Sequence, residues 1–265
     1  MKMRRHSIDC IFSEVSSEYA TYRASYSKLA IDKILEGLDN PSQLMTVDLG
    51  AGTGIGSRQL AEKGLKVIAI EPDPAMIQFA TPHPLIEFQA NIAEVTQLPD
   101  DTADLVTCFT AFHWFDFEHS LREIQRILKP SGRLALIWNH WDTGDPFSRC
   151  YKRLVRRAGR QSRARITPYD KFPSGLVKAA RILLLWNRCL IPNFQNVVRY
   201  RFTHQQTVDL AKLIGCASSY SFPLEKKIYQ QLVRDLKTLI DRSQAPHRLV
   251  YKTTLFLAEP KIKVW

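Results

Sequence analysis

The most informative part of this chain is Val47-Asp48-Leu49-Gly50-Ala51-Gly52-Thr53-Gly54-Ile55-Gly56. An acid ends an apolar run there, and four glycines follow at alternate positions. A second apolar run, Val67-Ile68-Ala69-Ile70, ends at a second acid, Glu71. Glycine lets the chain turn tightly and lets a ligand approach the backbone, and a helix after the loop presents free N–H groups. The pattern predicts a nucleotide-cofactor site at two strand ends. The alternative is a glycine-rich turn without a ligand.

The glycine spacing narrows the choice of cofactor. A dehydrogenase loop, G-x-G-x-x-G, needs its third glycine at a position that holds Ile55 or Ser57. A phosphate loop needs a lysine near Gly56, and none is there. A carboxylate at Asp48 would repel a pyrophosphate but suits a cofactor with a cationic amino-acid end, such as S-adenosylmethionine. Glu71 would then accept hydrogen bonds from the ribose hydroxyls.

Further motifs follow the glycine loop. They are Glu71-Pro72-Asp73-Pro74-Ala75-Met76, then Ala93-Glu94 with Leu98-Pro99, then Ala111-Phe112-His113-Trp114-Phe115-Asp116, and finally Leu128-Lys129-Pro130-Ser131-Gly132-Arg133 before an apolar strand. With the loop, they make residues 20–142 resemble the class I S-adenosylmethionine-dependent methyltransferases. The closer resemblance is to the methyltransferase-type-11-like, small-molecule branch. Residues 19–26 resemble the lead-in helix of that family, although Ala24 stands where many relatives carry proline.

The resemblance implies a set of site residues. Those expected to bind S-adenosylmethionine are Arg23, Asp48, Gly50, Ala51, Gly52, Glu71, Pro72, Met76, Ala93, Glu94, Phe109 and Thr110. Those expected to line the acceptor pocket are Tyr19, His113, Trp114, Asn139, His140 and Trp141. In the family, Arg23 would approach the methionine carboxylate and Met76 would pack on the adenine. No metal ligand set is expected.

His113 is the candidate for a general base or an orienting donor, because it follows a strand at the edge where open α/β sheets bind ligands. The alternative is a histidine that only shapes the pocket. Trp114 could place its ring near the sulfonium or pack in the core. Asp116 is expected to cap the next helix rather than take part in chemistry.

Strands alternate with helices, which predicts a Rossmann-like α/β fold. The expected form is a doubly wound, mostly parallel seven-stranded sheet with an antiparallel last strand and a helical lid. Residues 1–265 are expected to form one domain, with substrate-cover insertions at 142–196 and 205–242. Segment 165–195 matches the family poorly and gives little periodic signal.

The expected strands span 44–49, 66–70, 85–89, 104–110, 133–138, 197–203 and 249–257. The expected helices span 15–37, 53–63, 74–80, 118–128, 146–164, 207–214 and 224–240. The helix at 118–128 is expected to end because Pro130-Ser131-Gly132 follows it.

The net charge of +11 is concentrated in one segment. Residues 149–181 hold eleven Lys and Arg against one acid, Asp170. This field can be a solvated face, can attract an anionic substrate, or can touch RNA or an acidic membrane surface. Tyr151 is the only aromatic residue in 149–165, which argues against a stacking platform for nucleic acid.

Five scattered cysteines without a C-x-x-C pair suggest reduced thiols and a cytoplasmic protein. No apolar run is long enough to span a bilayer. We expect a methyltransferase that acts on a small, anionic molecule, with no nucleic-acid partner. The alternatives are an RNA methyltransferase and a non-catalytic protein that binds S-adenosylmethionine. The oligomeric state cannot be inferred.

Overall fold

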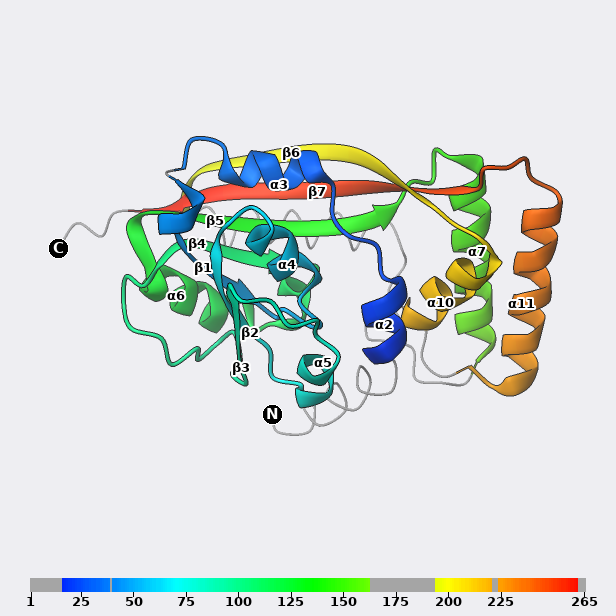
Figure 1. The fold of residues 1–265 in the computed structure, drawn as a ribbon, viewed down its shortest axis with the longest axis horizontal. Coiled ribbons are helices and arrows are strands. Elements are labelled where there is room, and N and C mark those ends of the chain that lie inside the picture. Colours follow the sequence, from blue (N-terminus) through cyan, green and yellow to red (C-terminus); the bar gives the residue numbers. More distant parts are fainter. Residues whose placement is uncertain (1–15, 39, 163–193, 221–223, 262–265) are drawn as a thin grey trace. The chain divides into compact units, whose positions relative to one another are not determined.

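The computed structural model of the chain describes residues 16–38, 40–162, 194–220 and 224–261. In these residues seven strands form one sheet in the order β3-β2-β1-β4-β5-β7-β6 (Figure 1). The strands are β1 Met45–Leu49, β2 Lys66–Ile70, β3 Ile86–Gln89, β4 Ala103–Phe109, β5 Leu128–Trp141, β6 Phe194–Thr207 and β7 Arg248–Pro260. The first five strands in this order, β3, β2, β1, β4 and β5, pair in parallel. Strand β7 runs opposite to its neighbours β5 and β6. The predicted Rossmann-like sheet with an antiparallel last strand is confirmed.

Helices and short turns connect the strands. The helices are α2 Ser16–Tyr22, α3 Lys28–Leu35, α4 Ile55–Ala61, α5 Pro74–Gln78, α6 Phe117–Ile127, α7 Pro146–Gln161, α10 Leu210–Tyr220 and α11 Lys226–Asp241, with the single turns η1 Pro41–Gln43 and η2 Phe112–Trp114. Helices α5, α6 and α7 each begin after an aspartate whose side chain accepts hydrogen bonds from backbone N–H groups of the first turn. These aspartates are Asp73, Asp116 and Asp145. Such caps satisfy amides that lack a partner in the first turn. The predicted capping role of Asp116 is confirmed.

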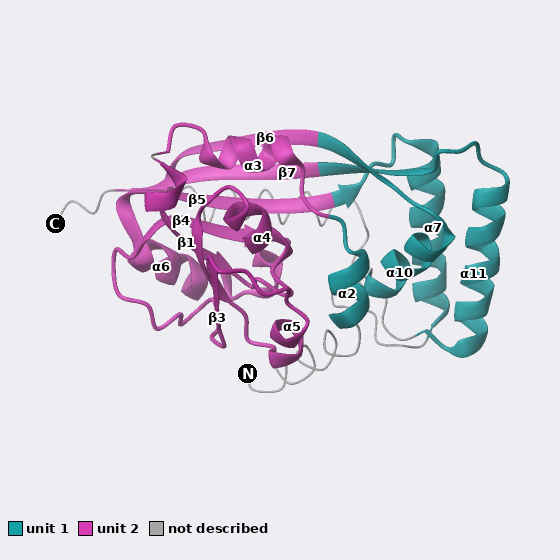
Figure 2. Cartoon of the chain, in the orientation of Figure 1, with its two compact units in different colours: residues 1–24, 140–174, 203–252 teal, residues 25–139, 175–202, 253–265 magenta. Residues whose placement is uncertain are grey.

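The chain divides into two compact units, which Figure 2 colours separately. Among the described residues, one unit contains 25–38, 40–139, 194–202 and 253–261, and the other contains 16–24, 140–162, 203–220 and 224–252. The first unit, here called the sheet unit, holds most of the seven-stranded sheet. The second, here called the helical unit, contains α2, α7, α10 and α11.

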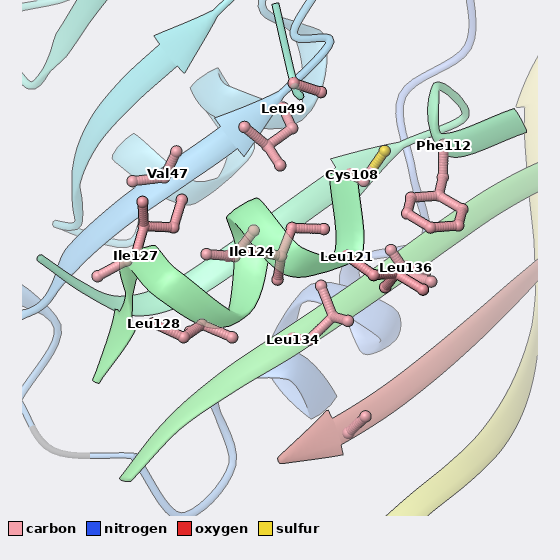
Figure 3. Packing of buried hydrophobic residues seen from close by; sticks show 14 of the residues in the cluster. Val47, Leu49, Cys108, Phe112, Leu121, Ile124, Ile127, Leu128, Leu134 and Leu136 are labelled. Atoms are coloured by element: carbon pink, nitrogen blue, oxygen red, sulfur yellow. The ribbon is translucent and has the colours of Figure 1, made fainter. Parts of the chain in front are cut away.

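Both faces of the sheet are buried within the sheet unit. On β5, Leu134 and Leu136 point into one cluster, while Ala135 and Ile137 belong to another. Figure 3 shows the first cluster, where three side chains of α6 lie over β1, β4 and β5: Leu121, Ile124 and Ile127. Helices α3 and α4 supply the second cluster. The alternation of side chains across each strand explains why helices are needed on both faces.

The helical unit has a core of its own. Tyr151 and Val155 of α7 are buried with Leu213 of α10 and Leu232 of α11. The Tyr151 hydroxyl donates to the Leu213 carbonyl at 2.9 Å. The predicted substrate-cover insertions fall largely in this unit, and their role stays a prediction. Most of segment 165–195 lies outside the described residues.

Three predicted elements differ from the structure. The helix expected at 207–214 is α10, Leu210–Tyr220, and Thr207 ends strand β6 instead. The helix expected at 15–37 is interrupted between α2 and α3, because both backbone groups of Tyr26 bond to the Gln59 side chain instead of to a helix. Strand β5 begins at Leu128 and includes the predicted stop at 130–132. There Ala103 pairs with Leu128 and Leu105 with Arg133, so the extra residues form a bulge within the strand.

Candidate cofactor and substrate site

The glycine loop connects β1 to α4 by a left-handed path. Gly50, Gly52 and Gly54 have φ values of 66°, 60° and 76°. The amides of Gly50 and Ala51 both donate to the Ile70 carbonyl, at 2.8 and 3.1 Å, which fastens the loop to the end of β2. Glycine tolerates such φ values without a steric penalty.

The loop is also packed closely on the residues after β4. A Cβ on Gly50 would lie 2.6 Å from the Ala111 Cβ and 3.1 Å from the Phe115 ring. A Cβ on Gly56 would lie 2.2 Å from the Phe109 ring, which packs against α4 in that space. The glycine repeat therefore serves two purposes, since Gly50 shapes the loop and Gly56 brings the helix against the sheet.

Asp48 is completely buried beneath this loop. Its two carboxylate oxygens accept hydrogen bonds from the Ser57 hydroxyl at 2.6 Å and the Thr107 hydroxyl at 2.9 Å. Burial raises the pKa of Asp48 to about 7, against the effect of the two hydroxyls, and the nearby charge of Glu71 adds to the rise. Asp48 thus joins β1, α4 and β4 at one point, and it changes charge near neutral pH.

Glu71 closes the loop from the end of β2. One carboxylate oxygen accepts the Gly52 amide at 2.8 Å, and the other accepts the Asp73 amide at 3.0 Å. The side chain is nearly buried, at 8% exposure. A carboxylate held by backbone donors is fixed in orientation, which suits a group that must meet two neighbouring hydroxyls of a ribose.

The residues predicted near the adenine lie beyond Glu71. Met76 of α5 is buried and Pro72 is exposed. Ala93 is buried in the loop after β3, and the Glu94 carboxylate accepts the Asp116 amide at 2.8 Å. This bond ties the loop after β3 to the start of α6.

The tip of β4 carries local strain. Thr110 has a φ of 56°, an uncommon value for a β-branched residue. Its amide donates to the Ile137 carbonyl at 2.7 Å, and its hydroxyl accepts from the Tyr26 hydroxyl at 2.9 Å. The Tyr26 ring packs on Phe109 with centroids 4.7 Å apart. Thr110 is thus held from β5 and from the segment before α3.

His113 lies in η2, three residues past Thr110. Its Nδ1 accepts a hydrogen bond from the indole Nε1–H of Trp138, at 3.2 Å. The rings of His113 and Trp114 are 5.1 Å apart and tilted by 38°. Both side chains are partly exposed, at the same edge of the sheet as the glycine loop.

Comparison with known proteins settles the family at this point. The model of the methyltransferase domain matches residues 47–136, which run from the glycine loop through η2 into β5. An uncharacterized methyltransferase of Mycobacterium tuberculosis is 31% identical over 193 residues, covering 72% of this chain and 76% of that protein. The chain belongs to the class I methyltransferase family.

Other relatives and solved structures agree with this assignment. An uncharacterized methyltransferase of Schizosaccharomyces pombe is 32% identical over 146 residues, covering 54% of this methyltransferase and 58% of the relative. The crystal structure of the YcgJ protein from Bacillus subtilis matches with a TM-score of 0.53 at 16% identity, over 89% of this chain and 99% of that chain. A phosphoethanolamine N-methyltransferase of Haemonchus contortus, in complex with S-adenosylhomocysteine, matches with a TM-score of 0.52 at 16% identity, over 97% of this chain and 59% of that one. The two structures show the fold.

The remaining predicted site residues divide between the two units. In the sheet unit, the Asn139 amide donates to the Ser25 carbonyl at 3.0 Å and accepts from the Thr253 hydroxyl at 2.7 Å. His140 and Trp141 belong to the helical unit, where the Trp141 ring meets Tyr151 edge-on at 5.0 Å.

Tyr19 and Arg23 also lie in the helical unit. The Arg23 guanidinium stacks over the Tyr19 ring at 4.8 Å and donates to the Ser219 carbonyl at 3.3 Å. The two side chains predicted to meet ligand from the lead-in segment therefore form a pair with each other.

Four residues that support the candidate site were not predicted from the sequence: Ser57, Thr107, Gln59 and Trp138. The first two hold Asp48, the third holds Tyr26, and the fourth holds His113. Ser57 and Gln59 lie within the helix that follows the glycine loop, so proximity to the motif was a usable signal for them. Thr107 and Trp138 lie on other strands, and only strand pairing brings them to the site.

In the residues that the structure describes, no helix is long and apolar enough to cross a membrane. The same residues hold no cluster of three or more His, Cys, Asp and Glu side chains that could bind a metal ion.

Proposed function

We propose that the chain transfers a methyl group from S-adenosylmethionine to a small, anionic acceptor molecule. The observation that carries the proposal is Glu71, whose carboxylate is held by the amides of Gly52 and Asp73 at the end of β2. It stands across the glycine loop from Asp48, as a ribose-binding acid would. The neighbour from Haemonchus contortus, which was solved with S-adenosylhomocysteine, supports the choice of cofactor.

The residues around the loop fit the cofactor in three ways. Gly50 and Gly52 give the loop its left-handed path without side chains of their own, Glu71 can accept from ribose hydroxyls, and buried Met76 and Ala93 offer an apolar surface for an adenine. Bound S-adenosylmethionine would supply an activated methyl group on a sulfonium. The chain then needs chiefly to align the acceptor, which can contribute roughly 7–11 kcal/mol.

Asp48 has a supporting role in this proposal. Because the carboxyl group is buried and bonded to Ser57 and Thr107, it acts on the cofactor through its charge and through the shape of the loop. A cation placed nearby favours the ionised form of an acid. Binding of the cofactor at pH 6 to 7 should therefore release a proton from Asp48.

The acceptor is proposed to be anionic because of the charge on α7. Its exposed side chains include Arg149, Arg153, Arg156 and Arg160, spaced to lie along one side of the helix. The helix carries no acidic residue. Lys152 is half-buried, and burial together with Arg156 lowers its pKa. Such a field attracts anions to the surface of the helical unit.

Calorimetry with S-adenosylhomocysteine tests the cofactor. Glu71→Ala should weaken binding by roughly 10- to 100-fold, since hydrogen bonds to a charged group contribute about 1.5–3 kcal/mol. Glu118→Ala is the matched control, because Glu118 is an exposed acid paired with Arg122 on α6. Absence of binding by the unmodified chain, or equal affinities for the two variants, would reject the proposal.

A methyl-transfer assay tests the acceptor class. With a methyl-labelled donor, small carboxylic acids should accept label, and the rate at low substrate should fall as salt is raised. Label that goes to RNA in preference to every small acid would move the function to nucleic-acid methylation. Cofactor binding without transfer to either class would indicate a non-catalytic protein.

A further inference from the structure

The bond between Trp138 and His113 fixes the chemical form of the histidine. An indole nitrogen can only donate a hydrogen bond. At 3.2 Å, the His113 Nδ1 must therefore be the acceptor and carry no proton. In a neutral imidazole the proton then resides on Nε2. Neutral His113 is thereby prepared as a hydrogen-bond donor at Nε2, whereas a general base would need a lone pair at that nitrogen.

The donor of this bond is itself held firmly. Trp138 lies on β5, the strand next to β4, and its ring meets Phe256 of β7 edge-on at 5.9 Å and 85°. Both partners belong to the sheet unit. A partly buried side chain that packs against the core and against a ring of the next strand is restrained when it orients a second ring.

The surroundings of His113 place it beside the glycine loop. Ala111 and Phe115 flank it in sequence, and both lie within 3.2 Å of the position that a Cβ on Gly50 would occupy. The residue therefore follows the strand tip that packs on the loop, at the edge where open α/β sheets bind their ligands.

We propose that Trp138 is a positioning residue that holds His113 as an Nε2–H donor, and that the site accordingly takes a methyl acceptor ionised before it binds, namely a carboxylate. This inference rests on the proposed function and names its acceptor chemistry. His113 donates to one carboxylate oxygen while the other attacks the methyl carbon. The new O–CH₃ bond forms as the S–CH₃ bond breaks, its electron pair stays on sulfur, and no proton is transferred to the protein.

The tautomer of His113 can be measured without any ligand. With histidine labelled by ¹⁵N, long-range ¹H–¹⁵N spectra separate protonated from unprotonated ring nitrogens, and His113→Gln assigns the signal among seven histidines. The unmodified chain at pH 8 should show His113 with the proton on Nε2. Trp138→Phe should remove the preference, giving a mixture of the two forms. A dominant Nδ1–H form in the unmodified chain would overturn the proposal.

Phe256→Leu is the matched control for packing. It disturbs the same ring contact and leaves the indole N–H in place. The His113 signals should therefore stay those of the Nε2–H form. If Phe256→Leu shifts the tautomer as much as Trp138→Phe does, packing rather than the hydrogen bond sets it, and the role assigned to Trp138 is wrong.

Two substitutions of His113 separate a donor from a base. The amide nitrogen of His113→Gln can donate from about the place of Nε2 but cannot take up a proton, and His113→Leu can do neither. With a carboxylate acceptor, the Gln variant should keep kcat/KM within about tenfold of the unmodified chain, while the Leu variant should lose roughly 10- to 100-fold more. Equal loss in both variants, or a preferred acceptor that must lose a proton, would overturn the proposal.

Failure of this inference and failure of the proposed function have different signatures. If S-adenosylhomocysteine does not bind, the function is wrong even when the tautomer is Nε2–H. If S-adenosylhomocysteine binds and Glu71→Ala weakens it, but His113 carries its proton on Nδ1, the function stands and the acceptor assignment falls.

Discussion

The tips of β1 and β2 and the tips of β4 and β5 lie along the same edge of the sheet, yet they are built on different principles. At the first pair, backbone glycines and two acids form the site, and their partners are amides and buried hydroxyls. At the second pair, partly exposed side chains form the site. Each is held by a residue far away in sequence, as Trp138 holds His113 through a hydrogen bond. The two pairs are here called the cofactor edge and the acceptor edge.

The two edges are expected to differ in how strongly they are coupled to stability. The cofactor edge is buried, so changes there should cost folding free energy as well as binding. The acceptor edge is half-exposed around His113, so changes there should affect chemistry more than stability. Four substitutions, in order of decreasing expected effect, test this contrast.

Gly50→Ala should have the largest effect. The left-handed backbone disfavours a side chain by about 1–2 kcal/mol, and overpacking against Ala111 adds about 1–3 kcal/mol. Urea titration should show a lower free energy of unfolding, and binding of S-adenosylhomocysteine should be lost. Gly159→Ala on α7 is the control, since nothing lies within 4 Å of its added Cβ. That change should be neutral or stabilising by up to about 1 kcal/mol.

Asp48→Asn should change how stability depends on pH. The folded-state pKa of Asp48, raised to about 7, lies above that of the unfolded chain, so the folded state holds the proton more tightly. Stability of the unmodified chain should therefore fall as pH rises from about 4 to 7, by an amount on the order of 2–4 kcal/mol. The variant lacks this contribution. The free energy of unfolding of Asp48→Asn, relative to that of the unmodified chain, should therefore increase from pH 4 to 7. Parallel pH profiles of the two proteins would contradict the raised pKa of Asp48.

Tyr26→Phe removes the hydroxyl that donates to Thr110 at the acceptor edge. The expected loss is about 1 kcal/mol in the free energy of unfolding, the usual contribution of one hydrogen bond. Thr110 would then lose one of the two contacts that hold its unusual backbone. Tyr229→Phe, at a side chain that is 40% exposed, should change stability by less than about 0.5 kcal/mol. Equal effects of the two variants would show that the Tyr26 hydroxyl contributes nothing.

His113→Gln should have the smallest effect on folding. The side chain is partly exposed, and a glutamine oxygen can still accept from the Trp138 indole. Urea titration should show a change below about 0.5 kcal/mol, and affinity for S-adenosylhomocysteine should stay within threefold. A loss as large as that of Gly50→Ala would end the contrast between the two edges.

Sequence alone predicted the features that depend on short spacings. The alternate glycines, the acid that ends each of two apolar runs and the helix–strand alternation predicted a Rossmann-like sheet, and the fold confirms it. The cap at Asp116 was also readable, because a cap depends on the two or three residues that follow it. The family assignment drew on the same local motifs.

The break between α2 and α3 was not predicted, nor was the bulge in β5. The first depends on Gln59, which competes for the backbone of Tyr26, and the second depends on the register between β4 and β5. Residue spacing within a segment carries no information on either. Segment 165–195, which shows little periodicity, lies largely outside the described residues.

Local sequence is enough to bring two acids and a bare backbone together at neighbouring strand tips, since parallel strands that end alike must end at the same edge. The hydroxyls of β4 and α4 that enclose Asp48, and the Trp138 indole that bonds His113 Nδ1, reach the site through packing of distant segments. Protonation follows from burial and hydrogen-bond partners, and these exist only once distant segments have packed.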